Sequence, residues 1–176
     1  STLSSQLSTN VIHAGELPSV DYERLGQHFT PTLLLWAPLL GLIGGAALPL
    51  VQVGLITAAG LTLHRLALGL LPERSANWLT YGFFAGNALI GPTLGNYTDL
   101  CQLPLAVFVL MLGLVERRRW WITGAALWIP LIREDTGVLL VAIGLWLLLR
   151  QRQRWPLAMA LIAWGGGWVL ICTNLL

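Results

Sequence analysis

The chain alternates between long apolar stretches and short polar or charged connections. A mixed polar segment covers residues 1–30, and seven apolar stretches follow it, at residues 31–43, 47–70, 77–94, 99–115, 120–132, 136–149 and 155–174. A membrane-spanning helix needs about 20 mostly apolar residues. The pattern therefore predicts an all-α, polytopic transmembrane helix bundle, with about six spanning helices and one shorter helix that is interfacial or re-entrant.

The amino-acid composition narrows the class of protein further. Hydrophobic residues make up 56% of the chain and charged residues 10%, and the mean hydropathy is +0.71. Soluble domains carry about 25% charged residues, so these values exclude a soluble enzyme, a disordered chain and a nucleic-acid binder. We expect the lipid bilayer as partner and no nucleic acid. Because the chain starts at Ser1 without a signal-peptide pattern and ends inside an apolar run at Leu176, we interpret it as a fragment of a longer membrane protein.

The arginines predict an orientation. Eight of the ten fall in three alternate connections, between the second and third, fourth and fifth, and sixth and seventh stretches, together with only Glu73 and Glu116. Eight arginines against two glutamates give this side a net charge of +6, whereas two arginines against six acids give the other side −4. The positive-inside rule makes the first side cytoplasmic and the second external.

This orientation divides the chain into three parts. Residues 1–30 become the end of an external, periplasmic loop, and residues 46–176 the transmembrane bundle. Residues 31–45 then start and end outside, so we expect an interfacial or re-entrant helix, because 13 apolar residues before Gly44 are too few to span. The alternative is a spanning hairpin through Gly44 and Gly45, which would invert every later connection.

Three consecutive ionisable residues, Arg133, Glu134 and Asp135, connect two short apolar stretches. The 13 uncharged residues after Arg119 give about 20 Å of helix, and residues 136–149 give about 21 Å, against a hydrocarbon core about 30 Å thick. We therefore expect the charges to be recessed below the outer headgroups, where charge must be paired or hydrated. The functional hypothesis is an acidic recess for a cation or polar substrate. The alternative is a loop tip whose charges lie in water.

Asp99 begins the fourth stretch on the same predicted side, and Thr98 or Asp99 could simply cap that helix. The functional hypothesis places Asp99 in one external site with Glu134 and Asp135, where the three carboxylates are candidate ligands for a divalent metal ion. His28, at the start of the first apolar stretch, is a candidate ligand or proton carrier.

Other motifs are few. No Walker A, GxSxG, HExxH or CxxC sequence occurs. Cys101 and Cys172 could form a disulfide, but we favour free thiols packed as small apolar groups. The glycines at 165–167 predict the close approach of another helix.

Two segments resemble a known family. His28-Phe29-Thr30-Pro31, followed by Leu33-Leu34-Leu35 and Ala37-Pro38-Leu39, resembles an HFSP-type segment with a downstream AP, and residues 131–137 (LIREDTG) resemble a KED-x-G segment after a basic, aromatic loop. Both are typical of a family of predicted membrane proteins, domain of unknown function 2079. Where that family has His-Pro-Glu, this chain has Tyr97-Thr98-Asp99, which retains the acid and not the histidine.

That family looks like a branch of the glycosyltransferase C superfamily. The resemblance implies sugar transfer from a polyprenyl-phosphate donor at the outer face of a membrane, with residues 31–43 as a surface helix. We expect this membrane to be the plasma membrane of a bacterium. It also implies a catalytic acid upstream of Ser1. From residues and resemblance together, the candidate catalytic residues are Asp99, Glu134, Asp135, Arg133 and His28, and the candidate substrate-binding residues are Tyr97, Glu23 and Asp21. The alternatives are a transporter or channel with a polar path, and a non-catalytic scaffold.

Overall fold

The described part of the chain is built from α-helices and short 3₁₀ turns. A computed structural model describes residues 31–86 and 98–175. Its helices are α2 (Leu33–Ile43), α3 (Ala47–Leu68), α4 (Glu73–Phe84), α6 (Leu103–Glu116), α7 (Arg119–Ile132), α8 (Gly137–Arg150) and α9 (Trp155–Leu175). The 3₁₀ turns are η2 (Gly44–Ala46), η3 (Asp99–Gln102), η4 (Glu134–Thr136) and η5 (Arg152–Arg154). The predicted all-α class is confirmed.

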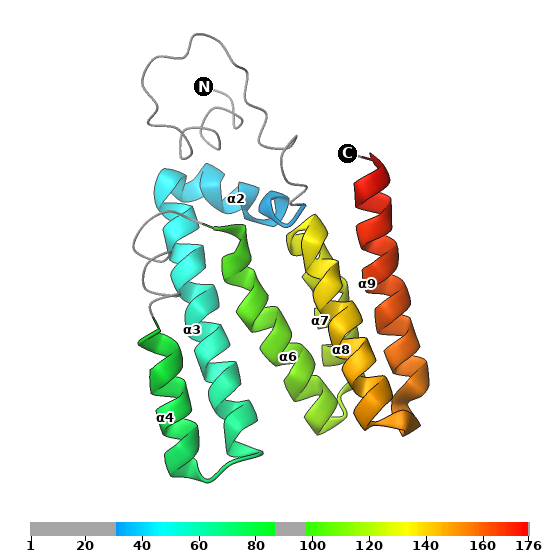
Figure 1. The fold of residues 1–176 in the computed structure, drawn as a ribbon. Coiled ribbons are helices and arrows are strands. Elements are labelled where there is room, and N and C mark those ends of the chain that lie inside the picture. The colour runs from blue at the N-terminus through cyan, green and yellow to red at the C-terminus, as the bar shows by residue number, and fades with distance from the viewer. Residues whose placement is uncertain (1–30, 87–97, 176) are drawn as a thin grey trace.

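Helix α2 differs from the others in direction. It lies across one end of the bundle, whereas α3, α4, α6, α7, α8 and α9 run roughly side by side (Figure 1). The chain turns from α2 into α3 at Gly44, whose φ of 64° and ψ of −147° are readily adopted only by glycine. A transverse α2 agrees with the arrangement expected of a surface helix, and its position in a membrane stays a prediction.

The arginine-rich connections all lie at the opposite end of the bundle from α2 (Figure 1). Side chains link them there: Arg65 on α3 pairs with Glu116 at 2.8 Å, and Arg154 donates from Nη1 to the Leu114 carbonyl oxygen at 2.9 Å. Both Arg65 and Arg118 lie over the ring of Trp121, 5.4 and 5.1 Å from its centre. The three connections therefore lie together at one end of the bundle. That this end lies on one side of a membrane, and that the side is cytoplasmic, stays a prediction.

Helices α8 and α9 pack backbone to backbone. A Cβ atom added to Gly165 would lie 2.4 Å from the Gly137 carbonyl oxygen, and one added to Gly144 would lie 2.8 Å from the Ala158 carbonyl oxygen. The predicted close approach is confirmed at Gly165, whereas Gly167 faces open space. Such close contact strengthens the van der Waals attraction between the two helices. This attraction matters in lipid because the hydrophobic effect cannot drive helix association there.

Proline shapes α7 from inside the helix. Pro130 has no N–H to donate to the Ala126 carbonyl oxygen, and the indole Nε1 of Trp164 on α9 donates to that oxygen instead, at 3.0 Å. The helix therefore continues to Ile132 with this carbonyl satisfied, as an apolar environment requires. Ile129 and Ile132 beside it are fully buried, together with Leu110, Leu140 and Leu147 from the neighbouring helices.

Predicted and observed boundaries agree closely except around α4. The start expected for the stretch at 77–94 is wrong, because the helix begins at Glu73, directly after Pro72. Helix α4 ends at Phe84, and the predicted end of the stretch, within residues 87–94, lies outside the described part. Within the described residues, three continuous helical stretches are long and apolar enough to span a membrane, Leu34–Leu68, Asp99–Glu116 and Arg152–Asn174. The first of them includes both α2 and α3, and the predicted total of about six spans stays a prediction.

Candidate functional site

The tip between α7 and α8 is an ordered turn. Arg133 ends α7 in an extended conformation (φ −161°, ψ 150°), and η4 follows at once. The Thr136 hydroxyl lies 2.5 Å from the Ile129 carbonyl oxygen and 2.7 Å from that of Arg133. The buried hydroxyl thus serves the Ile129 carbonyl oxygen, which the end of α7 leaves without a helical donor, and it joins the Thr136 backbone N–H at the Arg133 carbonyl oxygen.

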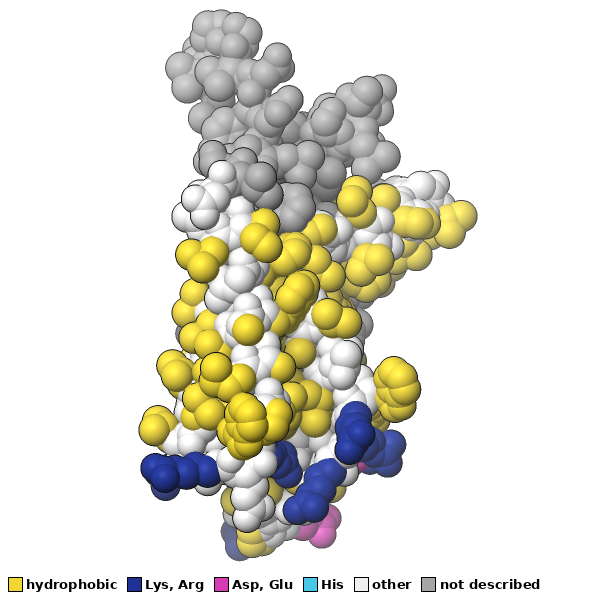
Figure 2. Space-filling model, turned by 90° about the vertical axis from the view of Figure 1, so that its right-hand side faces the viewer, with side chains coloured by type: hydrophobic (Ala, Val, Ile, Leu, Met, Phe, Trp, Pro, Cys, Tyr) yellow, Lys and Arg dark blue, Asp and Glu magenta, His cyan; other side chains and the backbone are white. Residues whose placement is uncertain are grey.

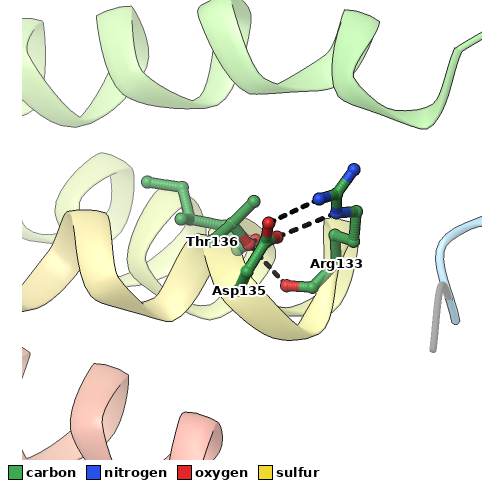
Figure 3. Close-up of polar contacts among 4 residues, drawn as sticks. Arg133, Asp135 and Thr136 are labelled. Atoms are coloured by element: carbon green, nitrogen blue, oxygen red, sulfur yellow. Dashed lines mark hydrogen bonds and ion pairs between the residues drawn. The ribbon is translucent and has the colours of Figure 1, made fainter. Parts of the chain in front are cut away.

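Arg133 and Asp135 form a two-pronged ion pair at this tip. Arg133 donates from Nε to Oδ1 of Asp135 at 2.9 Å and from Nη2 to Oδ2 at 2.6 Å (Figure 3). The side chains are 26% and 53% exposed, respectively, so the guanidinium group is the more enclosed partner. Such forked pairs fix orientation as well as charge. Of the two acidic residues that follow Arg133 in the sequence, Asp135 is the one that forms this forked pair.

The electrostatic surroundings of Arg133 include the other predicted acids. The hydrogen bonds that Arg133 donates to Asp135 raise the pKa of Arg133 above its ordinary value, partial burial opposes this rise, and the charges of Asp135, Glu134 and Asp99 add to it. Asp99 therefore contributes to the field at Arg133, although 34 residues separate them in the sequence. That Arg133 and the three acidic residues act as one functional site stays a prediction.

Asp99 is buried, with 7% of its surface exposed, as the first residue of η3. The predicted capping of the fourth stretch by Thr98 is wrong: the Thr98 side chain makes no capping hydrogen bond, and α6 proper starts four residues after Asp99, at Leu103. Instead the Thr98 backbone N–H donates to Oε1 of Gln52 on α3, at 3.0 Å. This bond fastens η3 to α3.

A cluster of buried polar side chains, which the sequence analysis missed, joins α2 to the site. Gln102 donates from Nε2 to the Thr32 hydroxyl at 3.0 Å and accepts from Trp128 Nε1 at 3.3 Å. The Thr32 backbone N–H donates to the Leu131 carbonyl oxygen at 3.3 Å, two residues before Arg133. The start of α2 is thus fastened to the end of α7. Single uncharged amides inside apolar stretches, Gln52 and Gln102, are the signal that could have revealed this cluster.

The predicted metal site is not supported by the geometry. Among the described residues, no three His, Cys, Asp or Glu side chains lie together where they could hold a metal ion. Asp99, Glu134 and Asp135 therefore do not form one ligand set, because Asp135 turns onto Arg133 while Asp99 is buried in η3. Four other candidates, His28, Tyr97, Glu23 and Asp21, lie outside the described residues.

The two cysteines are both free and buried, which confirms the preference for packed thiols over a disulfide. Cys101, within η3, packs with Val51 and Leu55 of α3 in a small apolar cluster.

Comparison with known proteins gives a family and no further detail. A family model described as "Predicted membrane protein (DUF2079)" matches residues 1–176. No curated protein and no solved structure matches the chain.

Proposed function

The chain belongs to the DUF2079 family of predicted membrane proteins, and we propose that this integral membrane protein transfers a sugar from a polyprenyl-phosphate donor at the external membrane face. The tip at residues 133–136 would be its reaction site. The proposal also includes the likeness to the glycosyltransferase C superfamily and a location in a bacterial plasma membrane.

The observation that carries the proposal is the forked pair of Arg133 and Asp135. Asp135 engages Nε and Nη2, two of the three nitrogens of the guanidinium group, and leaves the remaining N–H groups for another acceptor. A planar, permanently charged guanidinium group held in one orientation suits a phosphate, which it can bind through two parallel hydrogen bonds. Asp135 would be a positioning residue, and Arg133 would neutralise charge on the phosphate that leaves.

The reaction needs a base as well as a cation. The bond between the sugar C1 and the phosphate oxygen would break, a bond from C1 to the acceptor oxygen would form, and a carboxylate would take the acceptor proton. Glu134, which adjoins the fork and is half-buried, is the carboxylate that we assign to this step. Helix α2, whose first turn is fastened to α7 beside Arg133, would hold the polyprenyl chain near the phosphate.

The distribution of buried polar residues supports a site at one end over a path through the bundle. In the described part of the chain, the buried polar side chains are Thr32, Gln52, Asp99, Gln102 and Thr136. All five belong to the end of the bundle where α2 lies, and the main core between the ends is apolar. A transport path would need polar groups along its length.

The test is transfer of a labelled sugar from a polyprenyl-phosphate donor by the purified full-length protein in lipid. We expect Glu134→Gln to lower turnover about a hundredfold or more, the usual range for loss of a general base. Arg133→Lys should also lower it, because an ammonium group cannot form the fork. Glu73→Gln, at the opposite end of the bundle, is the matched control and should leave turnover unchanged. No transfer by the unaltered protein, or equal rates for all variants, would contradict the proposal.

A further inference from the structure

A second feature of the molecule, at the arginine-rich end, is independent of the proposed transferase site. A hollow of about 520 Å³ opens between the end of α6 and the connection from α8 to α9. Four arginines line it: Arg117, Arg150, Arg152 and Arg154. We propose that this hollow binds the phosphate headgroup of an anionic membrane lipid.

Within the described residues, no acidic side chain forms an ion pair with the arginines of the hollow. None of the residues that line it is acidic, and none of its four arginines forms an ion pair in the described part of the chain. Glu116, adjacent to Arg117 in the sequence, is already paired with Arg65 at 2.8 Å and with Arg118 at 2.9 Å. Four cations around one hollow repel one another, so an anion that enters it is favoured.

The backbone holds two of these arginines in place. Arg117 has a φ of 56°, a left-handed conformation that is unfavourable for a residue with a side chain and that glycine usually occupies. An arginine at this position directs its side chain to the hollow from the end of α6. From the other side, Arg154 is fixed by its hydrogen bond to the Leu114 carbonyl oxygen. The positive end of the α9 dipole begins at the next residue, Trp155, and adds to the field.

The surroundings of the hollow indicate a lipid rather than a soluble anion. Leu149 lines the hollow itself and is 80% exposed, and Trp155 beside it is 61% exposed. Figure 2 shows arginine side chains gathered at one end of a largely apolar surface. A ligand with a phosphate and acyl chains fits both the arginines and the apolar surface around them. Its phosphate would contact the arginines, and its acyl chains would lie on the apolar surface. Basic pockets at the cytoplasmic ends of transmembrane helices are typical sites for such headgroups.

The test measures lipid binding to the purified full-length protein in detergent by native mass spectrometry. Phosphatidylglycerol and cardiolipin are the anionic probes, and phosphatidylcholine is the neutral comparison. We expect the double variant Arg150→Gln, Arg152→Gln to bind the anionic lipids about tenfold or more weakly. The double variant Arg74→Gln, Arg119→Gln removes the same charge from the same end outside the hollow, and it should bind them as the unaltered protein does.

Two further measurements distinguish a lipid phosphate from a free phosphate and keep the proposal testable if a variant does not fold. Equal losses in the two double variants would overturn the proposal, because binding would then follow surface charge and not the hollow. Inorganic phosphate or glycerol phosphate that displaces the lipid at matched concentration would overturn the assignment to a lipid. If the glutamine variant does not fold, Arg150→Lys, Arg152→Lys keeps both charges; it should bind severalfold more weakly, and unchanged binding would contradict a site built on guanidinium geometry.

Discussion

Gln102 is the residue on which the end of the bundle near α2 depends most. Its amide is fully buried, donates to the Thr32 hydroxyl and accepts from the Trp128 indole. An amide suits this position because it can donate and accept at once, and no apolar residue can do either. Since Thr32 is also bonded to the end of α7, Gln102 couples the surface helix to the tip that carries Arg133.

Replacing Gln102 with leucine should therefore weaken more than one contact. We expect Gln102→Leu to lower the free energy of unfolding by about 1–3 kcal/mol, because it leaves a buried hydroxyl and a half-buried indole N–H without this partner. Amide hydrogen exchange in α2 should rise as well. Gln153→Leu, an exposed position on η5, is the control and should change stability by less than about 0.5 kcal/mol. Unchanged exchange in α2 would show that Gln102 does not fasten this helix.

At the scale of elements, the contact between α8 and α9 begins at the site itself. Gly137 follows Thr136 directly and faces Gly165, so the tip is held against α9 by backbone contact. The Cβ of an alanine at Gly165 would lie 2.4 Å from a carbonyl oxygen and 3.3 Å from the backbone nitrogen of Val141. Backbone atoms cannot move aside as the end of a flexible side chain can.

Gly165→Ala should accordingly force the two helices apart. We expect a loss of about 1–3 kcal/mol in unfolding free energy, the usual cost of overpacking. Gly167→Ala, two residues along the same helix and facing open space, is the matched control and should be neutral or slightly stabilising. Unfolding in mixed micelles measures both. A Gly167→Ala variant as unstable as Gly165→Ala would point to backbone flexibility and not to helix contact.

How well the helix boundaries can be predicted from the sequence depends on which residues lie at those boundaries. Charge and interfacial tryptophan bound α7, α8 and α9, so their limits are predicted to within one or two residues. The start of α4 is missed because Glu73, Arg74 and Ser75 look like a polar loop, although they form its first turn after Pro72. Local periodicity does not report such a turn, because the polar face of a helix end and a loop have similar composition.

The candidate site is predictable only in part, for a related reason. An ion pair between residues as close in the sequence as Arg133 and Asp135 can be proposed from spacing alone, and that pair is present. The bonds of Gln102 to Thr32, 70 residues away, and of Trp164 to Ala126, 38 residues away, depend on helix packing. The place of Pro130 inside α7, stabilised by Trp164, likewise follows from tertiary contact and not from the sequence around it.

The whole molecule has two chemically different ends. One carries α2, the buried polar cluster and the acidic tip, and the other carries the linked arginines and the basic hollow (Figure 1). The proposed transferase site would use the first end, and the proposed lipid site the second. Both proposals require that the acidic end is external and the arginine end cytoplasmic, as the charge asymmetry predicts.

Cysteine accessibility in intact cells tests this orientation most directly. In a background with Cys101 and Cys172 replaced by alanine, single cysteines would be introduced at Arg118 and Gly45 and treated with a membrane-impermeant thiol reagent. Both positions are exposed in the structure, so the bilayer alone should decide labelling. We predict that Gly45→Cys is labelled from outside and that Arg118→Cys is labelled only after the cells are opened. Labelling of Arg118→Cys in intact cells would contradict the orientation and, with it, an external site at Arg133.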